Sequence, residues 1–334
     1  MVVNSVDLSP TEAFQCRQLA GQISAAQEFV AVRKAIDLAA QLPSTVCELS
    51  RLLTRGTGSG GIALIRGVPL GDAVAIPTPE VLSAESSSPA ESDVERLMLV
   101  LAGAFGNPFS FASQQRGRLV LDIFPVRGQE SSQLGSSSKE MMEWHAEHAF
   151  HPRRAHHILL LCLRNDQKVA TRYAFASDLK LSPDVIDELR RPQFVIIPDE
   201  SHSEAYNAAM AGARNNGSTP FSTITTMASQ PRRIAVLEGH DDVTISVDFP
   251  YMPAGLHSAR ANAALCALRE AIEEIAESVV LGPGDLLVLD NRRGVHAREG
   301  FTARYDGTDR WLKQLSVRSR SRSSSPGESD VHVY

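Results

Sequence analysis

The sequence of 334 residues lacks an apolar run long enough to span a membrane. The run LMLVLAGAF at residues 97–105 falls well short of the roughly 20 residues that a transmembrane helix needs. Positive charge is not in surplus either, because 33 Lys and Arg residues stand against 39 Asp and Glu residues. A nucleic-acid-binding surface needs clustered basic residues that neutralise phosphates. Neither a membrane nor a nucleic acid is therefore an expected partner.

Cysteine is scarce, and the four cysteines form no C-x-x-C pair. This scatter argues against a disulfide framework and indicates isolated thiols in a reducing compartment. The initial stretch MVVNSVDLSP also has neither the basic nor the apolar segment of a secretory signal. We therefore predict a cytoplasmic protein.

Helical periodicity dominates the first hundred residues. Apolar positions recur at helical spacing over residues 27–53, and Pro43 divides this stretch into two pieces. A further helix is predicted over residues 93–105, with Asp93 as its N-cap. Between them, the apolar run IALIRGVPL at residues 62–70 predicts a strand that ends at Gly67.

After Gly106 the pattern changes to short β-type runs separated by turn residues. The predicted strands cover residues 118–124, 156–163, 193–198, 233–239, 243–249, 285–290 and 311–317. One amphipathic helix, predicted over residues 258–280, interrupts them. Two long polar segments, 127–139 and 200–231, are predicted to be loops, the second a lid over a site. So many short strands indicate a sandwich or a barrel.

The segment WHAEHAFHPRR contains an H-x-E pair, His145 and Glu147. On a β-strand, residues i and i+2 project from the same face, which places an imidazole beside a carboxylate. His296 follows the predicted strand 285–290 and is the candidate for a third ligand. Two histidines and one carboxylate on one face of an octahedral ion form the facial triad of non-haem Fe(II) oxygenases.

Arg310 follows His296 by fourteen residues, in YDGTDRWLK. On a strand that returns past the metal, its guanidinium would bind a carboxylate through two hydrogen bonds. An oxygenase that uses 2-oxoglutarate needs such a fixed cation for the far carboxylate of this cosubstrate. The residues therefore predict Fe(II), 2-oxoglutarate and dioxygen as cofactor and cosubstrates.

Two segments resemble the clavaminate synthase-like branch of the Fe(II)/2-oxoglutarate oxygenases: WHAEHAFHPRRAHHILLLCLRN and DNRRGVHAREGFTARYDGTDRWLKQLSVR. That branch includes 3-hydroxylases of free arginine and asparagine from peptide-antibiotic pathways. The resemblance extends through IALIRGVPL and covers nearly the whole chain apart from its tail. It implies a mainly β fold with flanking helices, the double-stranded β-helix or distorted jelly roll. The expected single oxygenase domain spans residues 1–318, with a helical part over 1–106, a jelly-roll core over 107–318 and a flexible tail over 319–334.

The same resemblance implies roles for the residues that would hold the iron and the cosubstrate. His145, Glu147 and His296 match the iron ligands, and no catalytic residue beyond them is expected. Arg310 matches the arginine that binds 2-oxoglutarate. Thr171, in KVATRYA, matches a threonine whose hydroxyl touches the cosubstrate.

Three residues are implied to contact an amino-acid-like substrate. Gln114 matches a glutamine that contacts the substrate α-amino group, and Asp248 matches an acidic lid position that holds a basic or amide side chain. Glu147 is expected to face the substrate as well as the iron. The alternatives are an exposed loop glutamine for Gln114 and a solvated strand-end carboxylate for Asp248.

Two positions depart from the family pattern. Gln314 stands where the family usually has a second arginine that anchors the substrate carboxylate, and a neutral amide loses that ionic contact. Pro250 stands where arginine hydroxylases place a second acidic residue. Either another cation replaces the missing arginine, or the substrate carboxylate is absent, esterified or amidated. The candidate replacements are Arg116, Arg172, Arg292 and Arg298.

The predicted function is hydroxylation of an unactivated C–H bond of an amino acid or an amino-acid-derived metabolite in natural-product biosynthesis. Desaturation or ring closure by the same chemistry is an alternative, because small changes in substrate position decide between these outcomes. An alternative of another class is a non-catalytic jelly-roll protein that holds a structural metal such as zinc. A closed zinc site would need four protein ligands, commonly with cysteine, and only three candidates are found here.

Overall fold

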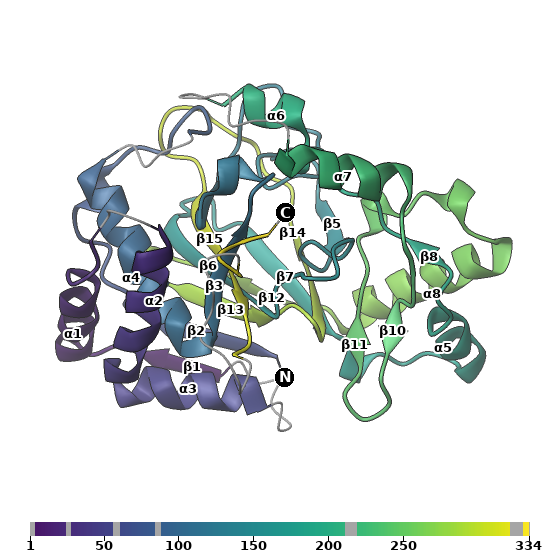
Figure 1. Cartoon of the computed structure of the whole chain (residues 1–334), viewed down its shortest axis with the longest axis horizontal. Helices are drawn as coiled ribbons and strands as arrows, with labels where there is room; N and C mark the ends of the chain where they lie inside the picture. The colour runs from purple at the N-terminus through teal and green to yellow at the C-terminus, as the bar shows by residue number, and fades with distance from the viewer. Residues whose placement is uncertain are drawn as a thin grey trace.

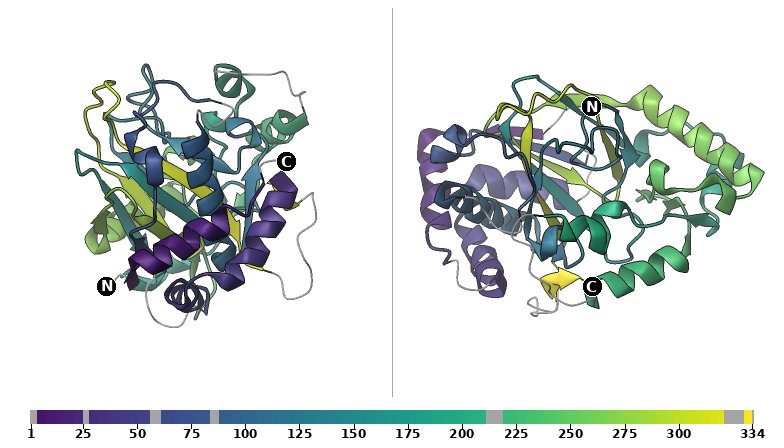
Figure 2. Two further views of the ribbon diagram at one scale, coloured as in Figure 1. Left: turned by 90° about the vertical axis from the view of Figure 1, so that its left-hand side faces the viewer. Right: turned by 90° about the horizontal axis from the view of Figure 1, so that it is seen from above.

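The computed structural model describes residues 4–24, 28–55, 61–83, 88–210, 219–320 and 330–333. A central body of β-strands has helices on two sides, as Figures 1 and 2 show. The helices of the N-terminal part are α1 (Pro10–Ala20), α2 (Glu28–Leu38), α3 (Ser44–Arg55) and α4 (Pro89–Phe105). The later helices are α5 (Pro183–Leu189), α6 (Glu204–Ala208), α7 (Thr219–Ser229) and α8 (Ala259–Ile275). No helix in the described ranges is long and apolar enough to cross a membrane.

A sheet of eight strands forms the larger β-layer. In spatial order its strands are β1 (Asn4–Asp7), β2 (Ile62–Arg66), β13 (Leu286–Asp290), β6 (His157–Arg164), β15 (Trp311–Arg318), β3 (Asn107–Phe111) and β16 (His332–Val333), and β4 (Val120–Ile123) also pairs with β15. The runs predicted as strands near β2, β4, β6, β13 and β15 are thus confirmed. The N-terminal part is not purely helical, because it supplies β1 and β2 to this sheet.

A second sheet of four antiparallel strands lies against the first. Its spatial order is β12 (Glu277–Val280), β7 (Ala170–Phe175), β14 (Gly294–Arg298) and β5 (Met142–His145). Two small antiparallel pairs complete the β-structure: β8 (Phe194–Val195) with β9 (Arg233–Ile234), and β10 (Leu237–Glu238) with β11 (Thr244–Ile245). The register between β5 and β14 places His145 directly opposite His296.

Strand β6 explains how the layers pack, because its successive side chains enter different cores. Ile158, Leu160 and Cys162 pack with Phe175 of β7 in the core between the two sheets. The alternate residues, beginning with Leu159, pack in the core beneath α1–α4. A strand covered on both faces is apolar throughout, which is why this run was readable in the sequence.

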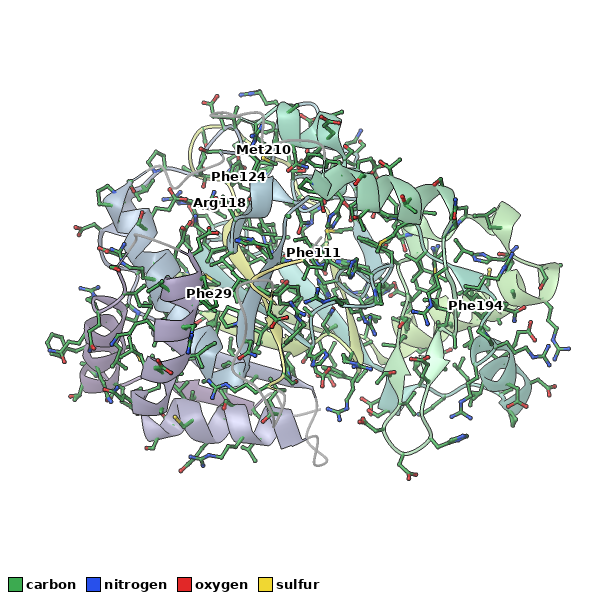
Figure 3. All side chains as sticks on the ribbon, viewed as in Figure 1. Phe29, Phe111, Arg118, Phe124, Phe194 and Met210 are labelled. Carbon is green, nitrogen blue, oxygen red and sulfur yellow. The ribbon has the colours of Figure 1, made fainter. Side chains whose placement is uncertain are left out.

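A third core lies around α5 and α8. Among the residues labelled in Figure 3, Phe111 lies in the core between the sheets, Phe124 in the core beneath the N-terminal helices and Phe194 in the third core. The cavity described below opens between these packed regions and takes its lining from several of them.

The predicted start of α4 is wrong. The helix begins at Pro89 rather than near Asp93, and Ser88 is its N-cap. The Ser88 hydroxyl accepts a hydrogen bond from the backbone N–H of Glu91 at 3.2 Å. Proline at the first helical position suits this start, because its missing N–H would be unpaired there anyway.

The helix predicted over residues 258–280 is too long. In the structure α8 ends at Ile275, and the chain then enters β12, which pairs with β7. Val279 and Val280 are β-branched residues that favour a strand once a neighbouring edge is available. The runs predicted as strands over 193–198, 233–239 and 243–249 are also mostly irregular, because only the residue pairs of β8–β11 are hydrogen-bonded as ladders.

The long polar segments give mixed outcomes. Residues 127–139 contain no helix or strand, as predicted. The prediction of a loop over 200–231 is wrong where the segment is described, because it contains α6 and α7. Its residues 211–218 lie outside the described part of the chain.

The prediction of a flexible tail over 319–334 is wrong for its end. His332 and Val333 form β16, which pairs in parallel with β3, and Val331 and Val333 are buried. The His332 Nδ1 lies 2.9 Å from the Ser110 hydroxyl. Residues 321–329 lie outside the described part of the chain.

A buried ion cluster joins α4 to β4 and β15. Lys313 is fully buried, and its Nζ lies 2.9 Å from Glu95 and 2.8 Å from Asp122 and also contacts Glu91. Arg118 pairs with the same Asp122 at 2.7 Å. Three carboxylates in such proximity resemble a cation site, but the Lys313 ammonium already contacts all three.

Replacing Lys313 with methionine is expected to lower the free energy of unfolding by about 3–5 kcal/mol, because the buried carboxylates lose their counter-charge. Urea unfolding followed by circular dichroism measures this loss. Lys34→Met on α2 is the matched control, because Lys34 is exposed. Equal stability of the two variants would show that the cluster contributes nothing to folding.

Candidate active site

The two histidines of the predicted metal site lie side by side on adjacent strands. His145 ends β5, His296 lies in β14, and their ring centroids are 4.1 Å apart. The Nδ1 atom of His145 lies 2.8 Å from the carbonyl oxygen of Glu143. A carbonyl only accepts, so Nδ1 carries the hydrogen and Nε2 keeps a free lone pair for a metal.

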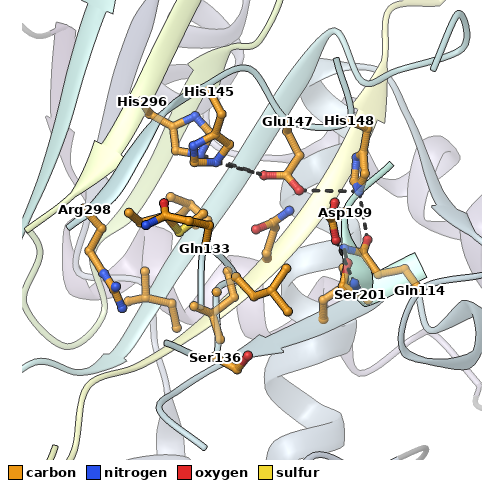
Figure 4. A pocket seen from close by; sticks show the side chains of 18 of the residues that line it. Gln114, Gln133, Ser136, His145, Glu147, His148, Asp199, Ser201, His296 and Arg298 are labelled. Atoms are coloured by element: carbon orange, nitrogen blue, oxygen red, sulfur yellow. Dashed lines mark hydrogen bonds and ion pairs between the residues drawn. The ribbon is translucent and has the colours of Figure 1, made fainter. Parts of the chain in front are cut away.

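Glu147 completes the group from a turn rather than from a strand. The prediction that H-x-E lies on one strand is wrong, because β5 ends at His145. Asn291 holds the backbone of Glu147 instead: its side chain accepts from the Glu147 N–H at 2.6 Å and donates to the Glu147 carbonyl at 2.9 Å. The carboxylate lies 3.8 Å from the Nε2 atoms of both His145 and His296 (Figure 4).

This group fits a metal ion. Ligand atoms of His145, Glu147 and His296 all lie within 4.8 Å of one another, and no fourth ligand joins them among the described residues. The His145 Nε2 is buried and has no hydrogen-bond partner. Burial lowers the pKa of both histidines, which keeps them neutral and able to donate lone pairs. Three ligands with open positions suit a catalytic ion rather than a closed structural zinc site.

Burial and, to a smaller extent, the nearby Asp199 raise the pKa of Glu147 to about 7. A carboxylate in this position gains from a cation, because a bound metal would compensate both the lost hydration and the neighbouring negative charge. Both the types of ligand atom and the raised pKa of Glu147 therefore indicate a cation site.

His145, Glu147 and His296, called the metal group below, line a cavity of about 100 Å³. Every other residue predicted to bind cosubstrate or substrate also lines this cavity. Arg310, immediately before β15, donates from Nη2 to the Thr171 hydroxyl of β7 at 3.3 Å. Both side chains are buried. Burial lowers the pKa of Arg310 to about 10, which still leaves it charged at neutral pH. Among the described residues, no carboxylate forms an ion pair with this guanidinium, so the cavity has a buried cation ready for an anionic ligand.

Two carboxylates give the cavity an acidic region. Asp248 is buried and its backbone bridges to His145, so its side chain lies near the metal group. Burial raises the pKa of Asp248 well above its usual range, and the charges of Asp199 and Glu147 raise it further. Asp199 was not identified from the sequence, because it lies in an irregular stretch after β8 with no motif around it. No lysine or arginine in the described part of the chain pairs with either Asp199 or Asp248.

Gln114 connects the metal side of the cavity to the segment that begins at residue 200. Its amide nitrogen donates to the Ser201 hydroxyl at 3.1 Å, and its amide oxygen lies 2.9 Å from His148 Nε2. The same His148 nitrogen is 3.4 Å from Glu147 (Figure 4). Gln114 is therefore a cavity residue rather than an exposed loop residue.

The structure also tests the arginines considered as substitutes at position 314. Gln314 lines the cavity, as does Arg298, whereas Arg116, Arg172 and Arg292 do not. Arg172 instead pairs with Glu273 at 2.6 Å.

Arg298 lies at the opposite end of the cavity from Gln114 and Asp199 (Figure 4). Its Nη2 donates to the Ser137 hydroxyl at 3.0 Å and to the Glu140 carbonyl at 3.1 Å. Of the four candidate arginines, only Arg298 lines this cavity and could contact a ligand in it. Arg298 lies close enough to Arg310 for the two charges to interact.

A family model described as "Taurine catabolism dioxygenase TauD, TfdA family" matches residues 25–316. The match covers most of the sequence, and the chain belongs to this family of dioxygenases.

Individual relatives agree with this family. The chain is 36% identical over 265 residues to the L-ornithine/L-arginine 3-hydroxylase of Catenulispora acidiphila, over 77% of each protein. It is 28% identical over 298 residues to clavaminate synthase 2 of Streptomyces clavuligerus, over 87% of this chain and 84% of that protein. The crystal structure of the non-heme iron oxygenase OrfP with Fe, succinate and (3S)-hydroxy-L-Arg has a TM-score of 0.85 at 34% identity, over 99% of this chain and 100% of that chain.

The resemblance to the clavaminate synthase-like oxygenases is thus confirmed, and the protein is an Fe(II)- and 2-oxoglutarate-dependent dioxygenase. Another crystal of OrfP contains Fe and alpha-ketoglutaric acid. The alternative of a non-catalytic metal-binding protein is not supported.

Proposed function

We propose that this dioxygenase hydroxylates a free amino acid whose side chain carries a positive charge. The observation that carries the proposal is the acidic region of the cavity, where Asp199 and Asp248 have no cationic partner among the described residues. Asp248 is buried and Asp199 is half-buried. Carboxylates that are withdrawn from water without a counter-charge are costly, and a cationic substrate would supply that charge. The similarity to an ornithine and arginine hydroxylase supports the same substrate class.

In this proposal the residues that line the cavity have three roles: they bind the iron, the cosubstrate and the substrate. His145, Glu147 and His296 would hold the iron, which together with 2-oxoglutarate and dioxygen would supply the oxidising power for C–H hydroxylation. Arg310 binds the far carboxylate of 2-oxoglutarate through its guanidinium, and the Thr171 hydroxyl adds a hydrogen bond. Both groups are buried, so water does not compete with these contacts.

The substrate would lie between the metal group and the acidic region. Gln114 offers its amide oxygen to the α-amino group, and Asp248 binds the cationic side chain. The carboxylate of Glu147 faces the same space. At Gln314 a neutral hydrogen-bond donor stands in place of the arginine that would bind the substrate carboxylate ionically. We therefore expect the enzyme to discriminate less strongly between a substrate with a free carboxylate and the corresponding amide.

We further interpret the two facing sheets as the double-stranded β-helix, or distorted jelly roll, of a single oxygenase domain that includes β16 near the end of the sequence. Hydroxylated basic amino acids are building blocks of peptide antibiotics, and natural-product biosynthesis is the proposed setting. The four cysteines are free thiols, which supports the proposal of a cytoplasmic enzyme.

Asp248→Asn should lower kcat/KM for basic amino acids by about 10- to 100-fold, the value of one charge-assisted hydrogen bond. Turnover of neutral amino acids should hardly change, because they do not use that charge. The measurement is succinate formation against a panel of arginine, ornithine, lysine, asparagine and the amides of each.

Asp241→Asn is the control, since Asp241 is an exposed carboxylate between β10 and β11 and does not line the cavity. Equal losses with basic and neutral substrates, or a wild-type preference for neutral ones, would contradict the proposed substrate class. Mass spectrometry of the product separates hydroxylation, which adds one oxygen atom, from desaturation or cyclisation, which removes two hydrogen atoms.

A further inference from the structure

A second cavity lies behind the turn that carries Glu147. Its volume is about 190 Å³, and Phe150, His151 and Arg154 of that turn form one wall. Arg232, which follows α7, Arg292, in the turn between β13 and β14, and residues within 234–246 also line it. None of these residues lines the cavity that contains the metal group.

Arg154 is a buried cation that forms no direct ion pair in the described part of the chain, although the charges of Asp290 and Glu238 act on it from nearby. Its side chain is 9% exposed, and Nη2 donates to the carbonyl of Ile245 at 2.6 Å. Its Nη1 is buried and has no hydrogen-bond partner in the described part of the chain. The buried cations Arg118 and Lys313, by contrast, are each surrounded by carboxylates. Burying a guanidinium without a partner costs free energy, and an anion bound in the adjacent space would offset that cost.

The other charged residues that line the cavity also favour an anionic ligand. Arg154, Arg232 and Arg292 contribute three positive charges, and Glu238 is the one carboxylate among the residues that line the cavity. The Nε2 of His151 is also buried without a partner. Burial, together with nearby positive groups, lowers the pKa of His151 to about 4, so at neutral pH it is an uncharged hydrogen-bonding group.

We propose that this cavity binds a phosphate group, held by the guanidinium groups of Arg154, Arg232 and Arg292. Three arginines against one carboxylate leave the described lining with a surplus of positive charge, which favours an anion. Guanidinium groups reach the cavity from three separate chain segments, which suits a tetrahedral oxyanion that presents acceptors in several directions. The phosphate is either a free ion or a phosphoryl group on a larger molecule, because the cavity is partly open to solvent.

Equilibrium dialysis with radiolabelled inorganic phosphate tests this site in anaerobic, iron-loaded enzyme with saturating 2-oxoglutarate and constant ionic strength. We expect saturable binding by the wild type, binding about tenfold weaker in Arg292→Ala, and none in Arg154→Met. Arg233→Ala is the matched control: it removes an adjacent exposed charge that does not line this cavity and should change affinity by less than about twofold. Competition by glycerol 3-phosphate would identify a phosphoryl group on a larger molecule, and its failure would identify free phosphate.

Arg310→Met should bind phosphate like the wild type, which separates this site from the cosubstrate site. Absence of saturable phosphate binding in the wild type would overturn the proposal. Unchanged affinity in Arg292→Ala would also overturn it, and because Arg292 is exposed this variant does not depend on a core position. Loss of binding in Arg310→Met would assign the phosphate to the metal cavity instead.

Discussion

His145→Ala should abolish iron binding and reduce succinate formation by at least about 100-fold, a larger loss than removal of a group that only supports a ligand. The reason is geometric. His145 and His296 face each other across a strand pair, and Glu147 lies 3.8 Å from both, so removing one imidazole would leave only two of the three residues that would hold the ion. Anaerobic titration with Fe(II) measures the affinity, and turnover assays measure the loss of activity.

The matched control for this variant is His240→Ala, which removes an exposed imidazole. A circular dichroism melt must show that the His145 variant is folded, and a modest gain in stability would be consistent with the unpartnered buried Nε2 of the wild type. If His145→Ala bound iron with wild-type affinity or kept wild-type turnover, the assignment of the three ligands would be wrong.

The predictable elements of the fold are those in which the sequence pattern and the tertiary environment agree. β6 and β13 are buried on both faces, so their apolar runs identify them without knowledge of their neighbours. β12 and β16 are different, because each becomes a strand only where β7 or β3 presents an edge. The start of α4 was available in the sequence: Ser88 and Glu91 have the spacing of a capping pair, with Pro89 between them.

The site shows the same division. His145 and Glu147 are close in the sequence, and the chemistry of a facial triad with a fixed cation made His296 and Arg310 candidates. Resemblance to a known family was needed to add Thr171. The structure brings all five together around one cavity.

Other parts of the site had no local signal. Asn291 positions the backbone of Glu147 through two hydrogen bonds across 144 residues of chain, a contact that only the folded chain creates. Asp199 reaches the cavity from irregular structure, where no periodicity indicates which way a side chain points.

Arg310→Met is expected to raise the KM for 2-oxoglutarate by about 100-fold or more, because breaking a buried ionic pair costs about 3–5 kcal/mol. The guanidinium is buried beside Thr171 and has no carboxylate partner among the described residues, so its charge is available to the cosubstrate. The affinity for Fe(II) should stay close to that of the wild type, because Arg310 is not one of the residues of the metal group.

The decisive comparison is the KM for 2-oxoglutarate against the KM for the amino acid. An arginine that only supports the fold would change both constants or lower stability, whereas a cosubstrate anchor changes the first alone. Arg310→Lys should lie between the wild type and Arg310→Met, since lysine keeps the charge but loses the paired hydrogen bonds. Arg304→Met, at an exposed position in the same loop, should behave like the wild type. A normal 2-oxoglutarate requirement in Arg310→Met would mean that another cation, with Arg298 as the candidate that lines the cavity, binds the cosubstrate.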